Sequence, residues 1–88
     1  MPNNLESNLV KIDKQNIWHP FTQHYTAKDH IVVEKAKGVY LYTEDGRQIL
    51  DAISSWWVNL FGHSNPIVAE AIAKQALTME HVIFANFT

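Results

Sequence analysis

The strand-turn-strand pattern around Asp45 and Gly46 is the feature that most constrains what this chain can fold into. Residues 39–42 alternate aliphatic and aromatic side chains before that pair, and an apolar stretch at residues 48–53 follows it. Alternation of this kind is typical of a half-buried strand, and an Asp-Gly pair between two such stretches is a strong hairpin signal. A β-branched run at residues 31–33 adds a further strand. The sequence therefore predicts a small antiparallel β-meander.

A helix is predicted after the meander, over residues 65–80. Asn65 can cap its first turn, and Pro66 suits the first helical position. Residues 1–16 are polar with a weak helical pattern, which predicts an N-terminal arm or short helix. Together these elements predict an α+β fold that consists of the arm, the small antiparallel meander and one amphipathic helix.

An aromatic-rich segment over residues 17–30 lies between the arm and the meander. Pro20 disfavours the α-helical region at His19, which predicts an extended or looped conformation. Aromatic loops more often dock onto a protein body or line a site than stand in water. We therefore expect this segment to contribute to a binding surface.

The adjacent residues Trp56 and Trp57 are the strongest recognition feature, and they follow the small hydroxyl residues Ser54 and Ser55. In a strand, neighbouring side chains point to opposite faces, so one indole would sit in a core while the other lines a surface or pocket. We interpret Trp56 as the exposed wall and Trp57 as its buried partner. The alternative is a plain hydrophobic core segment.

Composition excludes several classes of function. The 88 residues allow one domain at most, and the net charge of −2 with a single Arg gives no support for nucleic-acid binding. The chain has no Cys, so a disulfide framework is excluded, and it has no signal peptide or long apolar run. We therefore expect no membrane partner and a cytoplasmic location. The apolar tail over residues 81–88 predicts that the chain is a piece of something longer.

The sequence shows no self-contained catalytic constellation. No His is near enough in sequence to Asp51 to predict a triad with Ser54 or Ser55, and the G-x-S-x-G nucleophile elbow is absent. The five His residues lack the spacing of metal ligands, so no metal site is expected. These residues are His19, His24, His30, His63 and His81.

Several motifs nevertheless resemble one family. They are W-H-P-F-T at residues 18–22, G-V-Y-L-Y-T-E-D-G-R at residues 38–47, S-S-W-W at residues 54–57 and G-H-S-N-P at residues 62–66. Residues 17–88 resemble the N-terminal segment of the small domain of adenosylmethionine-8-amino-7-oxononanoate aminotransferases. These enzymes are a branch of the class III aminotransferases. The W-H-P-F-T and S-S-W-W motifs resemble that branch in particular, whereas the other two are shared with class III enzymes generally.

The resemblance implies a fold type I enzyme that uses pyridoxal 5'-phosphate. It would transfer the amino group of S-adenosylmethionine to 8-amino-7-oxononanoate, giving 7,8-diaminononanoate in biotin biosynthesis, and it would act as a homodimer. The substrate-binding residues implied are Trp56 and Phe21, with Ser55 and Trp57 in possible support. Phe21 stands where many relatives have Tyr, so it keeps the stacking face without the hydroxyl.

The resemblance also implies that the Schiff-base lysine, the phosphate-binding loop and the carboxylate-binding arginine lie far beyond residue 88. None of the chain's six lysines lies in a matching motif, so this segment alone is expected to be inactive and to contain no catalytic or cofactor-binding residue. Two alternatives remain: a segment of another class III aminotransferase, of the ω-amino acid or ornithine type, or a non-enzymatic α+β interaction module. The lysines are Lys11, Lys14, Lys28, Lys35, Lys37 and Lys74.

Overall fold

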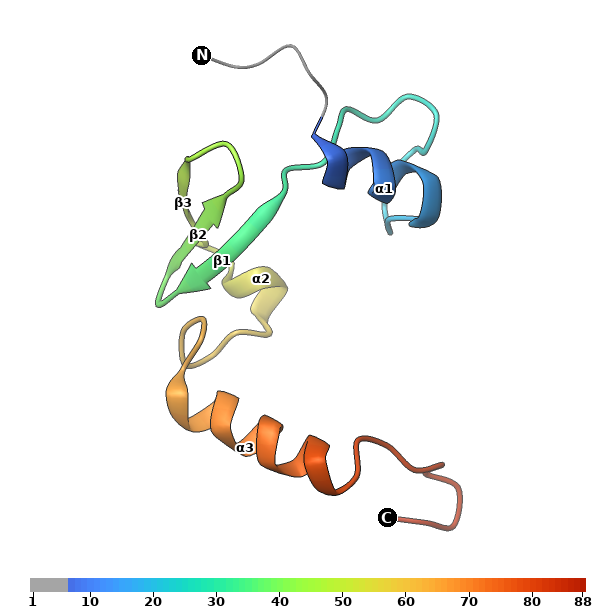
Figure 1. The fold of residues 1–88 in the computed structure, drawn as a ribbon, viewed down its shortest axis with the longest axis vertical. Helices are drawn as coiled ribbons and strands as arrows, with labels where there is room; N and C mark the ends of the chain where they lie inside the picture. The colour runs from blue at the N-terminus through green and yellow to red at the C-terminus, as the bar shows by residue number, and fades with distance from the viewer. Residues whose placement is uncertain (1–6) are drawn as a thin grey trace.

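The computed structural model describes residues 7–88, which form a three-stranded sheet flanked in sequence by helices (Figure 1). The sheet is antiparallel with the strand order β1-β2-β3, as the meander prediction required. The elements in chain order are α1 (Asn8–Asn16), β1 (Val33–Lys37), β2 (Tyr40–Thr43), β3 (Gln48–Leu50), α2 (Ser54–Trp57) and α3 (Pro66–Thr78).

The hairpin between β2 and β3 forms where the Asp-Gly pair predicts it. The Thr43 N–H donates to the Arg47 carbonyl at 2.9 Å, and the Gly46 N–H donates to the Thr43 carbonyl at 3.1 Å. Gly46 has a φ of 88°, a conformation that glycine adopts without steric cost. The Thr43 and Arg47 side chains both contact the Asp45 carboxylate and hold its pKa below the ordinary value. The turn thus fixes the register that pairs Leu41 with Ile49.

Both long helices are capped, and the cap of α3 is the one that the sequence predicts. The Asn65 side chain accepts hydrogen bonds from the N–H groups of Ile67 and Val68, and Pro66 is the first residue of α3. This confirms the predicted helix, which ends two residues earlier than expected, at Thr78. The arm contains a helix, α1, capped by the Ser7 side chain. The part of the arm prediction that covers residues 1–6 lies outside the described residues.

A close backbone approach brings the segment after α2 back to the sheet. Gly38 and His63 form an isolated bridge in which each N–H donates to the other's carbonyl, at 3.1 and 2.8 Å. Gly62 makes this approach possible, because a Cβ there would lie 3.3 Å from the Gly38 Cα. The bridge therefore carries His63 to the end of the sheet from which α2 starts.

The described residues bury little apolar surface. Val10 is their only buried hydrophobic residue and Thr43 their only buried polar residue. The radius of gyration of 16.7 Å exceeds the roughly 12 Å of a compact domain of this length. Within residues 7–88, α3 packs against neither the sheet nor another helix and extends away from them (Figure 1). Within residues 7–88, most apolar side chains of these elements are therefore left uncovered.

Candidate functional site

The S-S-W-W motif forms a left-handed helical turn, and the prediction of a strand at the tryptophans is wrong. Ser54, Ser55, Trp56 and Trp57 have positive φ angles between 47° and 69°. The Trp57 N–H donates to the Ile53 carbonyl at 2.8 Å, and the Val58 N–H to the Ser54 carbonyl at 2.9 Å. A left-handed helical conformation costs about 1–2 kcal/mol per non-glycine residue. Four such residues in succession therefore need strong tertiary support.

The Asp51 carboxylate supplies that support through a set of side chains that we call the Asp51 network: Asp51, Ser55, Asn59 and His63. One carboxylate oxygen accepts the Ser55 backbone N–H at 2.8 Å, and the other accepts the Ser55 hydroxyl at 2.6 Å. The second oxygen also lies 2.6 Å from the His63 Nε2. The Asn59 side-chain amide contacts the other ring nitrogen of His63 at 2.8 Å. Asp51 thus joins the turn to the Gly38–His63 bridge.

Within the Asp51 network, the carboxylate and the imidazole are shielded from water, whereas Ser55 is exposed. The side chains of Asp51 and His63 are 6% and 15% exposed. The two hydrogen bonds from Ser55, with the one from His63, lower the pKa of Asp51 to about 2. Asp51 is therefore an anion throughout the neutral pH range, and its charge strengthens each hydrogen bond that it accepts.

The Asp51 network is not a nucleophilic triad, although it contains Ser, His and Asp. In a triad the imidazole lies between the hydroxyl and the carboxylate, so that it can take the hydroxyl proton. Here the carboxylate lies between Ser55 and His63, and the hydroxyl donates to Asp51. The Asn59 side-chain amide contacts the second ring nitrogen of His63, so neither ring nitrogen faces the Ser55 hydroxyl. The arrangement orients the turn and leaves Ser55 without a base.

Three rings meet beside the turn in a group that we call the aromatic cluster: Phe21, Trp56 and Trp57. The Phe21 and Trp56 centroids are 5.2 Å apart, tilted by 49°. Trp57 meets Trp56 edge-on at 6.2 Å and 78°. The structure therefore unites residues from the W-H-P-F-T and S-S-W-W motifs, which lie 35 positions apart in the sequence.

The rings of the aromatic cluster are exposed and therefore accessible to a ligand or to further protein. Phe21 is 90% exposed, Trp57 82% and Trp56 53%. The expectation that Trp57 is the buried partner is wrong within the described residues, because the left-handed turn replaces the strand alternation on which it rested. Trp56 is instead the more covered indole, since it lies between the other two rings. Such amphipathic faces suit flat rings and aliphatic chains.

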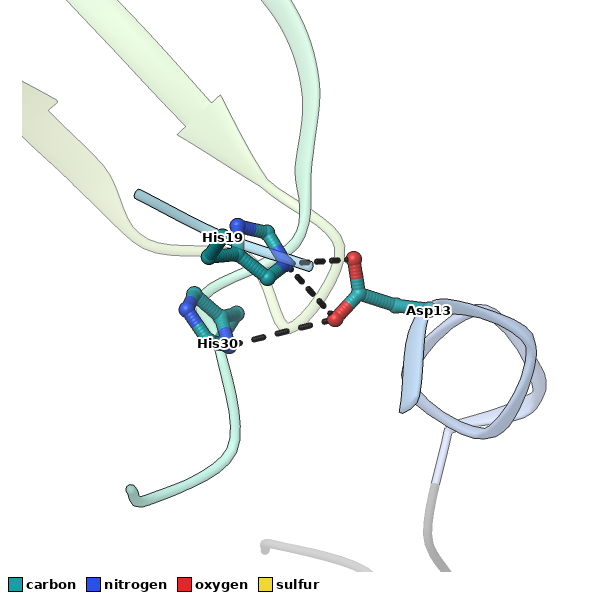
Figure 2. Close-up of side chains that lie close together, drawn as sticks. All are labelled: Asp13, His19 and His30. Atoms are coloured by element: carbon teal, nitrogen blue, oxygen red, sulfur yellow. Dashed lines mark hydrogen bonds and ion pairs between the residues drawn. The ribbon is translucent and has the colours of Figure 1, made fainter. Parts of the chain in front are cut away.

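A second set of polar side chains, the Asp13 clasp, ties the segment before Phe21 to α1. It consists of Asp13, His19 and His30 (Figure 2). The His19 Nε2 lies 2.7 and 2.9 Å from the two Asp13 oxygens, and the His30 Nδ1 lies 3.8 Å from one of them. The His19 and His30 rings stack with centroids 3.5 Å apart. Sequence reasoning missed this set, because Asp13 and His19 lie on either side of a helix end and follow no ligand spacing.

The Asp13 clasp does not have the geometry of a metal centre. An imidazole binds a metal with a lone pair in its ring plane, at about 2.0–2.1 Å for zinc. The His19 and His30 planes are nearly parallel, at 14°, and stack face to face. An ion in the plane of one ring would therefore lie well outside the plane of the other. The side-chain contacts in Figure 2 instead join α1 to the segment that contains Phe21.

The lysines among residues 7–88 lack the environment that a Schiff base with pyridoxal phosphate requires. A lysine that forms a Schiff base must be neutral to attack a carbonyl, which requires a desolvated or cationic setting. All six lysines are exposed, and Lys14 pairs with Asp29 at 2.7 Å. The chain offers an aromatic surface and its supports, without the group that would hold the cofactor covalently.

Residues 22–88 match the aminotransferase class III family, and the chain belongs to that family. Among curated proteins it is similar to the adenosylmethionine-8-amino-7-oxononanoate aminotransferase of Synechococcus elongatus, with 52% identity over 73 residues, covering 83% of this chain and 17% of that protein. The enzyme of the same name from Helicobacter pylori is 39% identical over 87 residues, covering 97% of this chain and 20% of that protein. The chain thus spans about a fifth of the length of these relatives.

Solved structures agree with this assignment. The crystal structure of the adenosylmethionine-8-amino-7-oxononanoate aminotransferase from Methanocaldococcus jannaschii has a TM-score of 0.74 at 41% identity, covering 91% of this chain and 19% of that one. A transaminase from the marine bacterium Virgibacillus has a TM-score of 0.76 at 28% identity, covering 93% of this chain and 19% of that one. The meander and its flanking helices are therefore part of a class III transaminase fold, as the sequence predicts.

Proposed function

We propose that this chain forms part of the substrate site of an adenosylmethionine-8-amino-7-oxononanoate aminotransferase. The Phe21–Trp56 contact carries the proposal, because it joins the two motifs that resemble this branch of the class III enzymes. The names of the relatives from Synechococcus elongatus and Helicobacter pylori support the same activity. The reaction would transfer the amino group of S-adenosylmethionine to 8-amino-7-oxononanoate, giving 7,8-diaminononanoate.

The aromatic cluster suits both proposed substrates. Trp56 presents a partly covered indole flanked by two more exposed rings. A flat aromatic face can stack on the adenine of the amino donor or cover the aliphatic chain of the keto acceptor. Phe21 contributes a stacking face without a hydroxyl. In this proposal Ser55 does not touch substrate and acts through its hydrogen bonds to Asp51.

The proposed activity requires groups that these 88 residues do not supply. Pyridoxal 5'-phosphate, when bound, would provide the electron sink for the transfer. A lysine outside the present sequence would hold it, since none of the chain's own lysines lies in a matching motif. We also propose that the enzyme is a cytoplasmic homodimer, with the many exposed apolar side chains of residues 7–88 covered by further protein. No helix of the described residues is long and apolar enough to cross a membrane.

The experiment that tests this proposal is an assay with a choice of donor. The gene that carries this sequence should be expressed whole and the protein purified with pyridoxal phosphate. We expect 7,8-diaminononanoate to form from 8-amino-7-oxononanoate when S-adenosylmethionine is the donor. A second candidate, an ω-transaminase, is favoured by the structural similarity to the transaminase from Virgibacillus. Turnover with simple ω-amines and none with S-adenosylmethionine would select it, and an open reading frame without a Schiff-base lysine would overturn both.

A further inference from the structure

We propose that Asp51 is a positioning residue for Trp56 in substrate binding, acting through Ser55 and His63. The inference deepens the proposed function and rests on it, since it explains what holds the substrate wall in place. Three observations carry it: the strained backbone of α2, the shielded Asp51 network below it and the exposed aromatic cluster beside it.

The strain at α2 must be balanced by specific contacts. Trp56 has a φ of 69° and a ψ of 51°, and none of its three neighbours in α2 is a glycine. Among the described residues, few apolar side chains cover α2. Besides the backbone hydrogen bonds of the turn and the ring contacts of Trp56, the side-chain hydrogen bonds to Asp51 hold this conformation. They fix Ser55, the residue immediately before Trp56, by both its backbone N–H and its hydroxyl.

The Asp51 network is anchored outside the turn as well. His63 reaches Asp51 from beyond α2 in the sequence, and its backbone is held by the bridge to Gly38. The carboxylate therefore connects the turn to the end of the sheet at Gly38. Trp56 receives its orientation from this connection and presents its ring to Phe21.

The charge of Asp51 matters more than its size. A carboxylate accepts all three hydrogen bonds from Ser55 and His63, whereas an asparagine of the same shape has a single acceptor oxygen. Asp51→Asn should therefore release His63 and one contact of Ser55 while preserving volume. Asp45→Asn is the matched control, because Asp45 also has a lowered pKa but lies in the β2–β3 turn, away from α2.

The first arm of the experiment measures steady-state kinetics of the whole enzyme with both substrates. We expect Asp51→Asn to lower kcat/KM by about 10- to 100-fold, the effect of losing hydrogen bonds to a charged group, mainly through KM. Asp51→Glu should recover part of the loss, since it restores the charge, and Asp45→Asn should match wild type. A loss confined to kcat, or an equal loss in Asp45→Asn, would overturn the proposal.

The second arm works without turnover and separates this inference from the proposed function. Protein labelled with 5-fluorotryptophan gives one fluorine resonance per indole, and Trp56→Phe assigns that of Trp56. Asp51→Asn should shift or broaden the Trp56 resonance and leave that of Trp18 unchanged. An unchanged Trp56 resonance would sink the positioning role even if the enzyme is active. If the wild type does not use the named substrates, the proposed function fails, while this arm still decides the positioning.

Ser55→Ala provides the milder variant should Asp51→Asn fail to fold. It removes the hydroxyl contact and keeps the backbone N–H contact to Asp51. A smaller rise in KM, with a smaller shift of the Trp56 resonance in the same direction, is expected. A Ser55→Ala protein that matches wild type in both measurements would contradict the proposal.

Discussion

The Asp13 clasp and the Asp51 network use the same pair of residue types for two different tasks. Each joins a carboxylate to an imidazole, and each supports one side of the Phe21–Trp56 contact. The clasp links side chains only, and its Asp and His side chains are 23% and 29% exposed. The network also binds backbone at Ser55 and is more shielded, at 6% and 15%. The comparison shows that the strained segment has the stronger anchor.

The difference follows from the backbone that each set must hold. The segment that contains Phe21 is a loop in which only Phe21 has a left-handed backbone conformation, whereas α2 has four such residues in succession. A loop that needs only to be tethered can rely on hydrogen bonds between two partly buried side chains, which contribute modestly to stability. A turn that costs several kcal/mol needs a charged acceptor shielded from water.

The largest expected effect follows removal of the Trp56 ring, whose contact with Phe21 the Asp13 clasp and the Asp51 network both support. Trp56→Ala should reduce transition-state binding by about 2–4 kcal/mol, as for other large aromatic contacts in a site. Under the proposed function a single site serves both half-reactions, so the loss should appear in kcat/KM for both S-adenosylmethionine and 8-amino-7-oxononanoate. Trp57→Ala is the control and should lose less, since Trp57 is the more exposed indole. A larger loss for Trp57→Ala would reverse the assignment of the wall.

Breaking the Asp13 clasp should have a smaller and more local effect. His19→Ala removes the contacts to Asp13 and should cost about 0.5–1.5 kcal/mol of unfolding free energy. It should also raise hydrogen exchange over residues 17–30 and shift the Trp56 fluorine resonance less than Asp51→Asn does, because Trp56 feels the clasp only through Phe21. His30→Ala is the matched control, expected to cost less than about 0.5 kcal/mol, because its nitrogen lies 3.8 Å from Asp13. Equal effects would mean that ring stacking, rather than the carboxylate contact, holds the loop.

The difference in stability between wild type and Asp51→Asn should depend on pH. The pKa of Asp51 is lowered in the folded chain from 3.8 to about 2, so its carboxylate stabilises the fold at pH values above about 4. That contribution is lost as the pH falls from about 4 towards 2. The unfolded state, in which the pKa of Asp51 is higher, binds the proton first, and protonation therefore favours unfolding over this range. The difference in urea midpoint between the two proteins should be constant above pH 5 and shrink below pH 4. A constant difference down to pH 2.5 would contradict the assigned pKa.

The smallest expected effect is that of zinc on the Asp13 clasp. Because the two imidazoles are stacked, we expect no saturable heat of zinc binding in the micromolar range that depends on these residues. Isothermal titration of wild type and His19→Ala should give the same result. Micromolar zinc binding that is lost in both His19→Ala and His30→Ala would show that the rings rotate to form a metal site.

The elements predicted from the sequence alone are those governed by local chemistry. The Asp-Gly turn, the strands β2 and β3 on either side of it and the Asn65-Pro66 start of α3 all appear as expected. The residues of the candidate site, Trp56 and Phe21, could also be chosen, because their motifs resemble a known branch of enzymes. The sequence also contains a signal for the Asp51–Ser55 contact, since an Asp followed by hydroxyl residues favours local hydrogen bonds to the backbone.

What only the tertiary structure decided is how these pieces meet. The left-handed turn of α2 reverses the faces that strand alternation assigned to Trp56 and Trp57, and no local propensity favours such a turn without glycine. The Phe21–Trp56 contact and the Asp51–His63 contact join residues distant in the sequence. Periodicity reports which side chains share a face within one element, whereas contacts between elements depend on where the chain returns. Here the Gly38–His63 bridge determines where the chain returns to the sheet, and it places the His63 imidazole within hydrogen-bond distance of Asp51, which holds the turn of α2.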